Sequence, residues 1–500
     1  MSRLSCGVVL PPRSERPAAD LAPFRFRAVD GHVLLTGDSG DHAFLSPAEF
    51  QALVAGEALP PARHAELAAK GLVPGGRDAA AEAARLAERK SFLATGPYLH
   101  VLVATLRCNQ GCVYCHASRI GMASASHDMT PETAERAVEV AMHSPAPQLT
   151  FEFQGGEPLA NFPVVERVVA RALELGRAAG KTIRFSLVSN LSLMDEEKLA
   201  FLLDHGVQVC TSLDGPQDLH DRNRPFAGGS SHAETVRWME RINEGYRARS
   251  LDPELYHVEA LLTVTRASLP RARDIVDEYV RRGLQAIFVR PLNPFGFAAR
   301  TWEQIGYGTG EFLRFHREVL DDLVARNREG TQLLERLTTI FLSKILSGTD
   351  PNYLDIRSPC GAGIGQIAYD HDGSVFSCDE GRMVNQMGDP MFRMGHLERD
   401  GYGDLVESEV VRSLCVASCL EALPGCSSCA YLPYCGTCPV YNYATQGNIF
   451  GRMPDNEKCR LHMGVLDDLF ARLAGADDAL RAIFHRWALP RDRPFFSHEA

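Results

Sequence analysis

The chain has 500 residues, of which 45% are hydrophobic and 23% are charged, and its formal net charge is −11. This length exceeds what one hydrophobic core usually holds, so we expect two or three domains of an ordinary soluble protein in the cytoplasm, without a secretion signal. The negative charge argues against nucleic-acid binding, which needs a clustered basic face, and no apolar run is long enough to cross a membrane.

The first segments predict a loose tail followed by a small α+β unit. Residues 1–20 are rich in Pro, Arg and Ala, which is typical of a poorly ordered terminus. Residues 21–95 predict a small N-terminal unit that closes with an Ala/Glu/Arg-rich linking helix. Strand-like segments with Gly/Asp turns come first, then a helix with Ser46 as its N-cap and Gly56 at its end. A second short helix is expected over 62–72.

Strands followed by two short helices resemble the winged-helix elements that hold leader peptides in peptide-maturation systems. The resemblance implies that the N-terminal unit recognises a peptide. The alternative is that this unit is a packing extension of the next domain, and the sequence leaves both interpretations open.

Residues 96–308 alternate strand-like and helical segments. Six apolar runs read as strands: YLHVLVATL, QLTFEFQ, IRFSLVSN, VQVCTSLDG, HVEALLTVT and QAIFVRPL. The intervening helices include one with N-cap Thr130 and one beginning at Asp195. This order predicts an α/β fold with a parallel sheet, closed or partly closed as a barrel, whose chemistry lies at the C-terminal ends of the strands. Residues 309–358 predict a helical connection.

The fourteen cysteines are unevenly distributed. Cys6 and Cys210 stand alone, three lie at 108–115, and nine fall between 360 and 459. Disulfides are rare in a reducing compartment, whereas closely spaced cysteines in a large cytoplasmic chain are typical of metal sites. The distribution therefore favours metal binding.

The first cysteine group directly follows the first strand of the predicted barrel. The stretch LRCNQGCVYCHASR places Cys108, Cys112 and Cys115 in a Cys-x3-Cys-x2-Cys spacing. A zinc site with three thiols needs a distant fourth ligand or a water, and His116 is adjacent to Cys115 and points elsewhere. Three thiolates can instead hold a [4Fe–4S] cluster and leave one iron free to bind something else.

This spacing, with Tyr114 before the last cysteine, resembles the radical S-adenosylmethionine (SAM) enzyme family. The resemblance implies a partial (β/α)6 radical SAM barrel and a SAM-binding [4Fe–4S] cluster. In that family the amino and carboxylate groups of SAM chelate the free iron. The reduced cluster then cleaves SAM, and the resulting 5′-deoxyadenosyl radical takes a hydrogen atom from a substrate.

Three further motifs, at the ends of the second, third and fourth strands, strengthen the resemblance. FQGGEP matches the family motif that holds the SAM amino group, and a plain Gly-Gly turn is its alternative. SN resembles the family's contacts to SAM, and SLDGPQDLHDRNRP places an arginine that can pair with the SAM carboxylate. A turn with an Asx cap is the alternative for Asp214. The cofactor-binding residues implied are Tyr114, Gly155, Gly156, Glu157, Ser189, Asn190, Ser212, Asp214 and Arg224.

Residues 359–475 predict a Cys-rich domain. By itself, the Cys-x2-Cys-x5-Cys-x2-Cys run at 426–438 is compatible with a zinc ribbon. Behind a radical SAM barrel, seven cysteines in this order resemble the SPASM extension, which binds two auxiliary [4Fe–4S] clusters in peptide-modifying enzymes. The resemblance implies one cluster on Cys426, Cys429, Cys435 and Cys459, and the other on Cys360, Cys378 and Cys438.

The Cys-rich region departs from that family pattern in two ways. The last Cys pair is one residue tighter than usual, and no cysteine stands beside Cys360. Either Cys415 or Cys419 supplies the missing thiolate, or that cluster has an open iron. Asp379 follows Cys378, and in sulfatase-maturing relatives an Asp at the corresponding position acts as a catalytic base, which suits a carboxylate whose pKa is raised by burial. An ordinary turn carboxylate is the alternative.

Three stretches together resemble the maturase of the His-Xaa-Ser repeat peptide system: TLRCNQGCVYC, FQGGEPLANF and CAYLPYCGTCPV. The resemblance covers roughly residues 20–475 and implies a precursor peptide substrate, a second radical SAM maturase as partner and an external electron donor, with no nucleic acid or membrane. The alternatives are a sulfatase-type maturase that generates formylglycine and a non-enzymatic metal-binding scaffold. Residues 476–500 predict a C-terminal tail.

Overall fold

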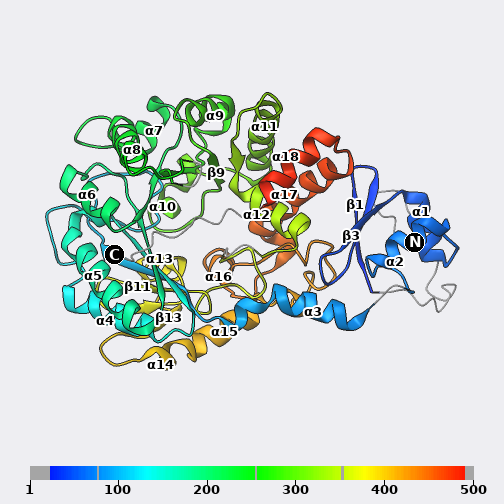
Figure 1. The fold of residues 1–500 in the computed structure, drawn as a ribbon, viewed down its shortest axis with the longest axis horizontal. Coiled ribbons are helices and arrows are strands. Elements are labelled where there is room, and N and C mark those ends of the chain that lie inside the picture. The colour runs from blue at the N-terminus through cyan, green and yellow to red at the C-terminus, as the bar shows by residue number, and fades with distance from the viewer. Residues whose placement is uncertain (1–22, 76–77, 254–255, 351–353, 490–500) are drawn as a thin grey trace.

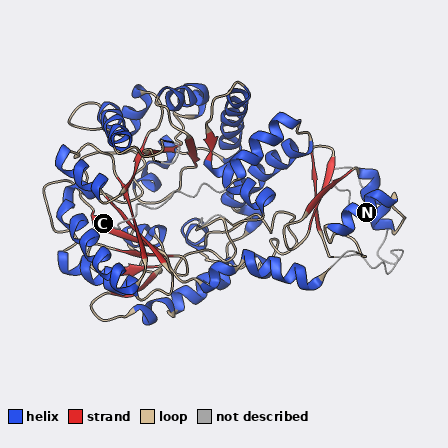
Figure 2. Ribbon diagram, viewed as in Figure 1, coloured by secondary structure: helices blue, strands red, loops and turns tan. Residues whose placement is uncertain are grey.

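The structure is a computed structural model that describes residues 23–75, 78–253, 256–350 and 354–489. The predicted tail at residues 1–20 lies outside the described residues. Figure 1 shows the N-terminal unit at one end of the molecule and the main sheet with its helices at the other, with α17 (Glu457–Ala474) and α18 (Asp478–Ala488) between them. The distribution of strands and helices is shown in Figure 2.

The N-terminal unit is an antiparallel three-stranded sheet covered by two helices. Its order is β1-β2-β3. Ser46 caps the first helix in a capping box with Glu49, and Gly56 ends that helix in a left-handed conformation, as the sequence predicts. The unit has its own hydrophobic cluster, built around Leu35, Phe50 and other buried apolar side chains. The elements are β1 (Arg25–Val29), β2 (His32–Thr36), β3 (His42–Leu45), α1 (Pro47–Ala55), α2 (Pro61–Ala69) and the linking helix α3 (Ala79–Arg89).

The main sheet has ten strands in the order β10-β9-β8-β7-β6-β5-β4-β11-β12-β13. Strands β4 to β10 pair with one another in parallel, and β11 is parallel to β4. Strand β12 is antiparallel to both β11 and β13. The predicted α/β class with a parallel sheet is therefore confirmed. The strands are β4 (Leu99–Thr105), β5 (Gln148–Gly155), β6 (Thr182–Val188), β7 (Gln208–Ser212), β8 (Glu259–Thr263), β9 (Ala286–Arg290), β10 (Leu334–Glu335), β11 (Gln366–Tyr369), β12 (Ser374–Phe376) and β13 (Arg393–His396).

The two faces of this sheet differ because successive side chains of a strand point to opposite sides. On β5, Phe151 and Phe153 are fully buried in the large hydrophobic cluster that also contains the inner faces of the helices. The other face carries side chains of intermediate exposure, including Glu152, Cys210 and Arg290. The helices are α4 (Pro131–Met142), α5 (Phe162–Ala179), α6 (Glu196–Asp204), α7 (Gln217–Asn223), α8 (Ser231–Ala248) and α9 (Ala272–Arg281).

The helical connection predicted for residues 309–358 is interrupted. Strand β10 and a short π-helical turn divide it, and β10 extends the edge of the main sheet. The predicted C-terminal tail contains helix α18, in which Phe484 and Trp487 are 0% and 1% exposed. The elements after the barrel are α10 (Phe297–Ile305), α11 (Thr309–Arg328), α12 (Arg336–Leu342), α13 (Asp379–Gln386), α14 (Tyr402–Val406), α15 (Glu409–Ser418) and α16 (Pro439–Gln446).

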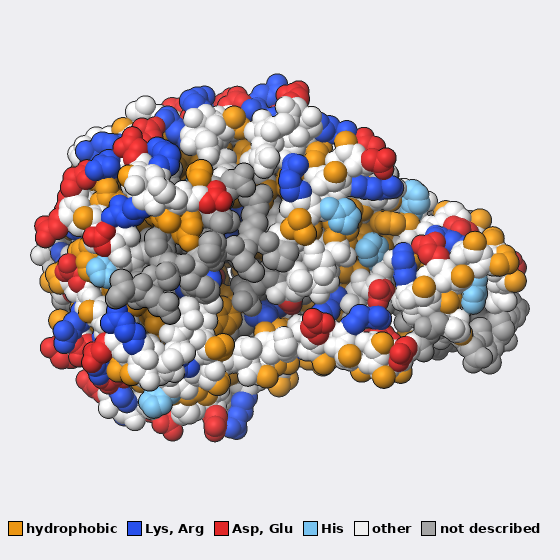
Figure 3. All heavy atoms as spheres, in the orientation of Figure 1, with side chains coloured by type: hydrophobic (Ala, Val, Ile, Leu, Met, Phe, Trp, Pro, Cys, Tyr) orange, Lys and Arg blue, Asp and Glu red, His pale blue; other side chains and the backbone are white. Residues whose placement is uncertain are grey.

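Charged side chains of both signs are interspersed over the face of the molecule in Figure 3. Within the described parts of the chain, no helix combines the length and the apolar character needed to span a membrane.

Candidate active site

The loop after β4 carries the three closely spaced cysteines, and neighbouring loops hold its backbone. The Val113 amide donates to the Asn223 carbonyl at 2.9 Å, which ties the loop to the end of α7. The Phe297 amide donates to the Cys115 carbonyl at 2.8 Å, which ties it to the start of α10. The loop is therefore fixed between two segments that follow other strands of the sheet.

The thiols of this loop are held in surroundings that disfavour a bare negative charge. Burial raises the pKa of the Cys108 thiol to about 12, with a further increase from the Glu157 carboxylate. Burial also raises the pKa of Cys112 to about 11, although the Arg224 guanidinium opposes the shift. A bound metal centre removes the thiol protons and neutralises the thiolates. A closely spaced three-thiol set therefore fits an iron–sulfur cluster.

Gly155 and Gly156 allow the end of β5 to pack directly on the backbone that begins the cysteine loop. A Cβ on Gly155 would lie 2.1 Å from the Thr105 carbonyl oxygen, and φ at Gly155 is 131°. A Cβ on Gly156 would lie 2.3 Å from the Arg107 carbonyl oxygen. The Gly156 amide donates to Thr105 at 2.7 Å. Glycine is therefore required at both positions, because only a residue without a Cβ lets the end of β5 approach the backbone after β4 this closely.

Glu157 links the ends of β5 and β6. Its buried carboxylate accepts hydrogen bonds from the Ser189 hydroxyl at 2.7 Å and the Asn190 amide at 2.8 Å. Burial raises the pKa of Glu157 to about 7, and these hydrogen bonds limit the increase. The Asn190 side chain in turn lies 3.6 Å from the Cys108 sulfur. The two strand ends are thereby connected to the first thiol of the cysteine loop.

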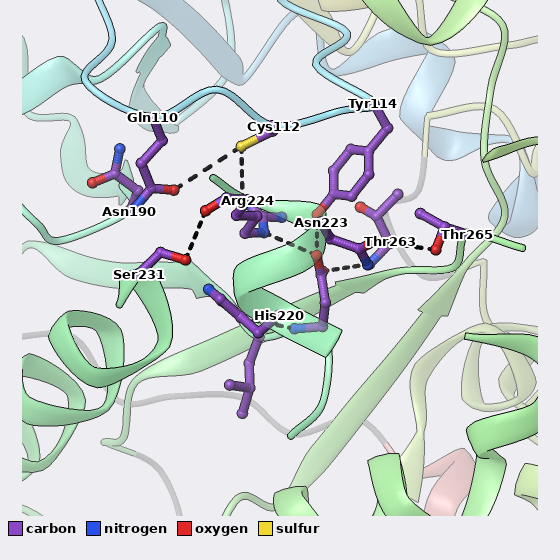
Figure 4. Close-up of polar contacts among 12 residues, drawn as sticks. Gln110, Cys112, Tyr114, Asn190, His220, Asn223, Arg224, Ser231, Thr263 and Thr265 are labelled. Atoms are coloured by element: carbon purple, nitrogen blue, oxygen red, sulfur yellow. Dashed lines mark hydrogen bonds and ion pairs between the residues drawn. The ribbon is translucent and has the colours of Figure 1, made fainter. Parts of the chain in front are cut away.

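Asp214, beyond the end of β7, is the centre of a buried polar cluster, and Figure 4 labels its neighbours Tyr114, Arg224 and Thr263. Its carboxylate accepts hydrogen bonds from the Tyr114 hydroxyl, from Arg224 Nε at 3.1 Å and from the Thr263 amide at 3.3 Å. Arg224 Nη1 lies 3.8 Å from the sulfur of Cys112. These contacts tie the Asp214 carboxylate to the cysteine loop, to the segment after α7 and to the end of β8.

Ser212 ends β7 on the same edge of the sheet, and its side chain is half-buried. All nine residues predicted to bind the cofactor therefore lie at the carboxyl ends of β4 to β7 or in the loops that follow them. The contacts above connect six of them into two networks, one through Glu157 and one through Asp214, and Gly155 and Gly156 pack on the backbone that begins the cysteine loop.

Asp379 is the first residue of α13 and is 9% exposed. Its carboxylate accepts from Arg382 Nε at 2.9 Å and lies 2.7 Å from Arg382 Nη2. Burial raises the pKa of Glu152, on the polar face of the sheet, and the Asp379 charge adds to the increase. Arg382 is also within electrostatic range of Cys115. Asp379 thus lies in a buried ion pair beside the polar face of the sheet.

The cysteines of the C-terminal region fall into two electrostatically coupled groups. Burial, and then the neighbouring Cys429, Cys459 and Cys426 thiols, raise the pKa of Cys435. Burial raises the pKa of Cys360, and Cys438 raises it further. Cys378 couples to both Cys360 and Cys438. We call these sets the 435 group (Cys426, Cys429, Cys435 and Cys459) and the 360 group (Cys360, Cys378 and Cys438).

Cys415 and Cys419 lie in a segment that contacts the 360 group, because the Ser418 hydroxyl accepts a hydrogen bond from the Cys360 amide at 2.9 Å. Both belong to α15 or its C-terminal end, and burial followed by the Cys419 charge raises the pKa of Cys415. The Cys419 thiol lies 3.4 Å from a carboxylate oxygen of Glu421. Over residues 23–75, 78–253, 256–350 and 354–489, no three His, Cys, Asp or Glu side chains converge as they would around a single metal ion.

Sequence reasoning missed Gly296, in the loop between β9 and α10. Its φ is 57°, and a Cβ there would lie 2.4 Å from the His116 carbonyl oxygen and 2.7 Å from that of Cys115. Gly296 therefore lets this loop pack on the end of the cysteine loop. The signal was the stretch PLNPFGF after the sixth strand, in which Gly296 stands two residues after Pro294.

The site combines a parallel sheet, a three-cysteine loop after β4 and polar groups on the adjacent strand ends. A comparison of the sequence with known families agrees with this arrangement. Residues 102–249 match the sequence model of the radical SAM superfamily. This part of the chain is a radical SAM domain, and the predicted enzyme class is confirmed.

Sequence relatives include characterised and uncharacterised proteins. An uncharacterised protein of Methanocaldococcus jannaschii is 27% identical over 39% of this chain and 62% of its own length. The radical SAM cyclopropyl synthase TigE of Paramaledivibacter caminithermalis is 30% identical over 29% of this chain and 32% of its own. A cysteine-type anaerobic sulfatase-maturating enzyme of Clostridium perfringens (strain 13) is 26% identical over 57% of this chain and 75% of its own length. The chain thus spans less than two thirds of the length of the Methanocaldococcus jannaschii protein and of TigE.

Two solved structures are similar to the fold over most of their length. The enzyme anSMEcpe with AdoMet and the Kp18Cys peptide has a TM-score of 0.61, with 20% identity over 76% of this chain and 99% of its own. SuiB of Streptococcus suis bound to the precursor peptide SuiA has a TM-score of 0.52, with 15% identity over 86% of this chain and 97% of its own. At these identities the likeness demonstrates a shared fold alone.

Proposed function

We propose that this enzyme cleaves SAM reductively and uses the product to modify a ribosomally synthesised peptide. The observation that carries the proposal is the set of three closely spaced thiols, the buried Cys108 and the half-buried Cys112 and Cys115, at the carboxyl end of a parallel strand in a domain that matches the radical SAM superfamily. When bound, a reduced [4Fe–4S] cluster with SAM supplies a 5′-deoxyadenosyl radical that takes a hydrogen atom from a substrate.

The chain's own residues position that chemistry. The three thiolates hold the cluster, and the buried Asp214–Arg224 pair fixes Arg224 beside Cys112. Arg224 is a suitable partner for the SAM carboxylate because a guanidinium forms charge-assisted hydrogen bonds in a fixed geometry. Gly155 and Gly156 keep the end of β5 close to the cysteine loop and exclude side chains from that approach. Glu157, Ser189 and the other predicted cofactor-binding residues complete the SAM site in this proposal.

We assign the 435 group and the 360 group to two auxiliary [4Fe–4S] clusters. The support is their electrostatic coupling into one set of four thiols and one of three. In the same proposal Asp379 accepts a proton from the substrate, and Arg382 holds its carboxylate in place.

The peptide substrate is supported by the relatives and by the cysteine motifs. Among the similar structures, SuiB was solved with a precursor peptide and anSMEcpe with the Kp18Cys peptide. The motif resemblance described above extends the proposal to a His-Xaa-Ser repeat peptide, with a second radical SAM maturase as partner. In this proposal the enzyme works in the cytoplasm and takes electrons from an external donor. The N-terminal unit holds the leader of the peptide.

The test measures 5′-deoxyadenosine formation by anaerobically purified, iron-loaded enzyme with SAM and a chemical reductant. We expect the wild-type enzyme to form it and Cys112→Ala to abolish it, because two thiolates do not retain the cluster. Cys210→Ala is the matched control, since Cys210 lies on β7 outside all three thiol sets, and it should keep the activity. Cleavage of SAM by Cys112→Ala at the wild-type rate would refute the proposal.

The substrate is tested by the mass of a co-encoded peptide after incubation with the enzyme. A mass change in a His-Xaa-Ser repeat peptide supports the finer proposal. Formylglycine in a Cys- or Ser-containing sulfatase peptide, lost in Asp379→Asn, indicates the sulfatase-type alternative. Zinc in place of iron, with no cleavage of SAM, indicates a metal-binding scaffold.

A further inference from the structure

A cavity of about 720 Å³ lies at the end of the sheet opposite the cysteine loop. It is lined by residues at the amino-terminal ends of β4 and β5, by the β2–β3 turn of the N-terminal unit, by α3 and by residues 345–350. Figure 1 shows α3 running from the N-terminal unit to the rest of the chain. The volume is in the range of small-molecule sites, which is about 300–1,000 Å³.

Arg357 lines this cavity and is 1% exposed. Its guanidinium carbon lies 3.3 Å from the centroid of the Phe92 ring. Neither Nε nor Nη1 forms a hydrogen bond of good geometry with the residues that the structure describes. The same holds for the Tyr98 hydroxyl, which lies close enough to the Arg357 guanidinium to interact with it electrostatically. Stacking on an aromatic ring stabilises a cation in part, but it leaves the N–H donors unused.

Arg89 of α3 also lines the cavity without a carboxylate partner in the described part of the chain. Its two terminal nitrogens donate to the carbonyl oxygens of Ser39 at 2.5 Å and Pro433 at 2.6 Å. These carbonyls satisfy donors and carry no neutralising charge. Two largely buried guanidinium groups therefore face one cavity, each without an ion pair to the described residues.

The acidic side chains around the cavity do not balance these charges. The Asp350 carboxylate acts electrostatically on both Arg357 and Arg89, and it also lies 3.7 Å from the buried ammonium group of Lys344. Asp41, which also acts on Arg89, lies 3.4 Å from Arg85, and Glu88 is exposed to solvent. Three cations that share one buried carboxylate leave an excess of positive charge, so the arrangement favours an anion that enters from outside.

We propose that this cavity binds a small anion that carries carboxylate or phosphate groups. Arg357 and Arg89 supply the charge, and the Tyr98 hydroxyl supplies a further hydrogen bond. The site is separate from the proposed SAM site, because it lies at the opposite ends of the strands and shares none of its residues.

The test is calorimetric titration of the iron-loaded full chain with citrate and with inorganic phosphate, at constant ionic strength so that non-specific screening is equal. We expect at least one anion to bind, and the tighter one identifies the carboxylate or the phosphate class. Arg357→Met should weaken binding about tenfold or more, because it removes charge-assisted hydrogen bonds. Arg85→Met is the matched control: Arg85 lines the same cavity but is 52% exposed, and binding should stay within about twofold.

A second variant separates binding from folding. Tyr98→Phe removes only a hydroxyl that forms no hydrogen bond of good geometry with the described residues, so the melting temperature should not fall. Its affinity for the anion should drop about threefold to tenfold. The proposal is overturned if neither anion binds, or if Arg357→Met and Tyr98→Phe bind as tightly as the wild type.

Discussion

Gly156 illustrates how one missing side chain can determine the geometry of the candidate site. We predict that Gly156→Ala disrupts the cysteine loop, because the new Cβ would meet the Arg107 carbonyl at 2.3 Å and that of Leu106 at 2.5 Å, both of which belong to the backbone. Backbone cannot rotate away as a side chain can, so overlap of this kind costs about 1–3 kcal/mol or more. The measurement is iron content and thermal stability after anaerobic reconstitution, both of which should fall.

The control for this prediction is Gly121→Ala in the segment that follows the cysteines. A Cβ there has no atom within 4 Å, and Gly121 is not among the glycines with positive φ. Such a substitution is neutral or stabilises by about 0.4–1 kcal/mol through the unfolded state. If Gly156→Ala kept as much iron as Gly121→Ala, the close approach of β5 to the loop would have no role in holding the cluster.

At this scale the sequence identified the right positions but not all of their contacts. The spacing of Cys108, Cys112 and Cys115 was sufficient to predict a three-thiol set. By contrast, the Tyr114–Asp214 hydrogen bond joins residues 100 positions apart. No periodicity or spacing encodes such a pair, because it depends on which strand ends the fold brings together.

Among the elements, those with explicit terminal signals were predicted most accurately. The helix with N-cap Thr130 and the six strands β4 to β9 occur where the sequence indicated. Strand β10 has two residues, which is too short to show alternation, and β11 joins the sheet by pairing with β4, which is distant in sequence. Helix α18 was missed although Leu480 and Trp487 lie on one periodic apolar stripe, because the segment stands near the end of the chain.

The contact of β3 with α17 provides a pH-dependent prediction. The ring of His42 lies 5.4 Å from that of Phe470 and 6.5 Å from that of Tyr434. Burial lowers the pKa of His42 to about 4, and Lys70 lowers it further. The unfolded chain binds a proton near pH 6.5 while the folded protein does not, so acidification from pH 6.5 to 5 should remove about 2 kcal/mol of stability.

The measurement is denaturant unfolding and amide exchange of β3 at pH 5 and pH 7. His42→Phe keeps an aromatic ring in the contact and removes the titrating group, so its stability should change less with pH than that of the wild type. The same loss on acidification in both proteins would assign the effect to other groups.

At the scale of the whole molecule, the 435 group lies where the N-terminal unit meets the rest of the chain. Arg27 of β1 is paired with Asp467 of α17 at 2.6 Å, and the Tyr431 hydroxyl donates to the same carboxylate at 2.6 Å. Thr36 of β2 donates to the Ala430 carbonyl at 2.8 Å. The loop that carries Cys429 and Cys435 is therefore part of the surface on which the N-terminal unit rests.

This placement predicts different outcomes for the two C-terminal thiol groups. Cys435→Ala and Cys378→Ala should each lower the iron content by about one third, since each removes a ligand of one of the three proposed clusters. Cys435→Ala should also increase amide exchange in β1 and β2, because the loop that holds Ala430 and Tyr431 loses its cross-link. Cys378→Ala should leave that exchange unchanged, since the 360 group packs with α13, α15 and α16.

Cys419→Ala completes this comparison as the matched control. Cys419 couples to Glu421 and Cys415 rather than to either group, so both iron content and exchange should remain at wild-type values. An iron loss in Cys419→Ala equal to that in Cys378→Ala would instead make Cys419 the fourth ligand of the 360 group. If Cys435→Ala lost iron but left exchange in β1 and β2 unchanged, the N-terminal unit would be held by Arg27, Thr36 and their partners alone.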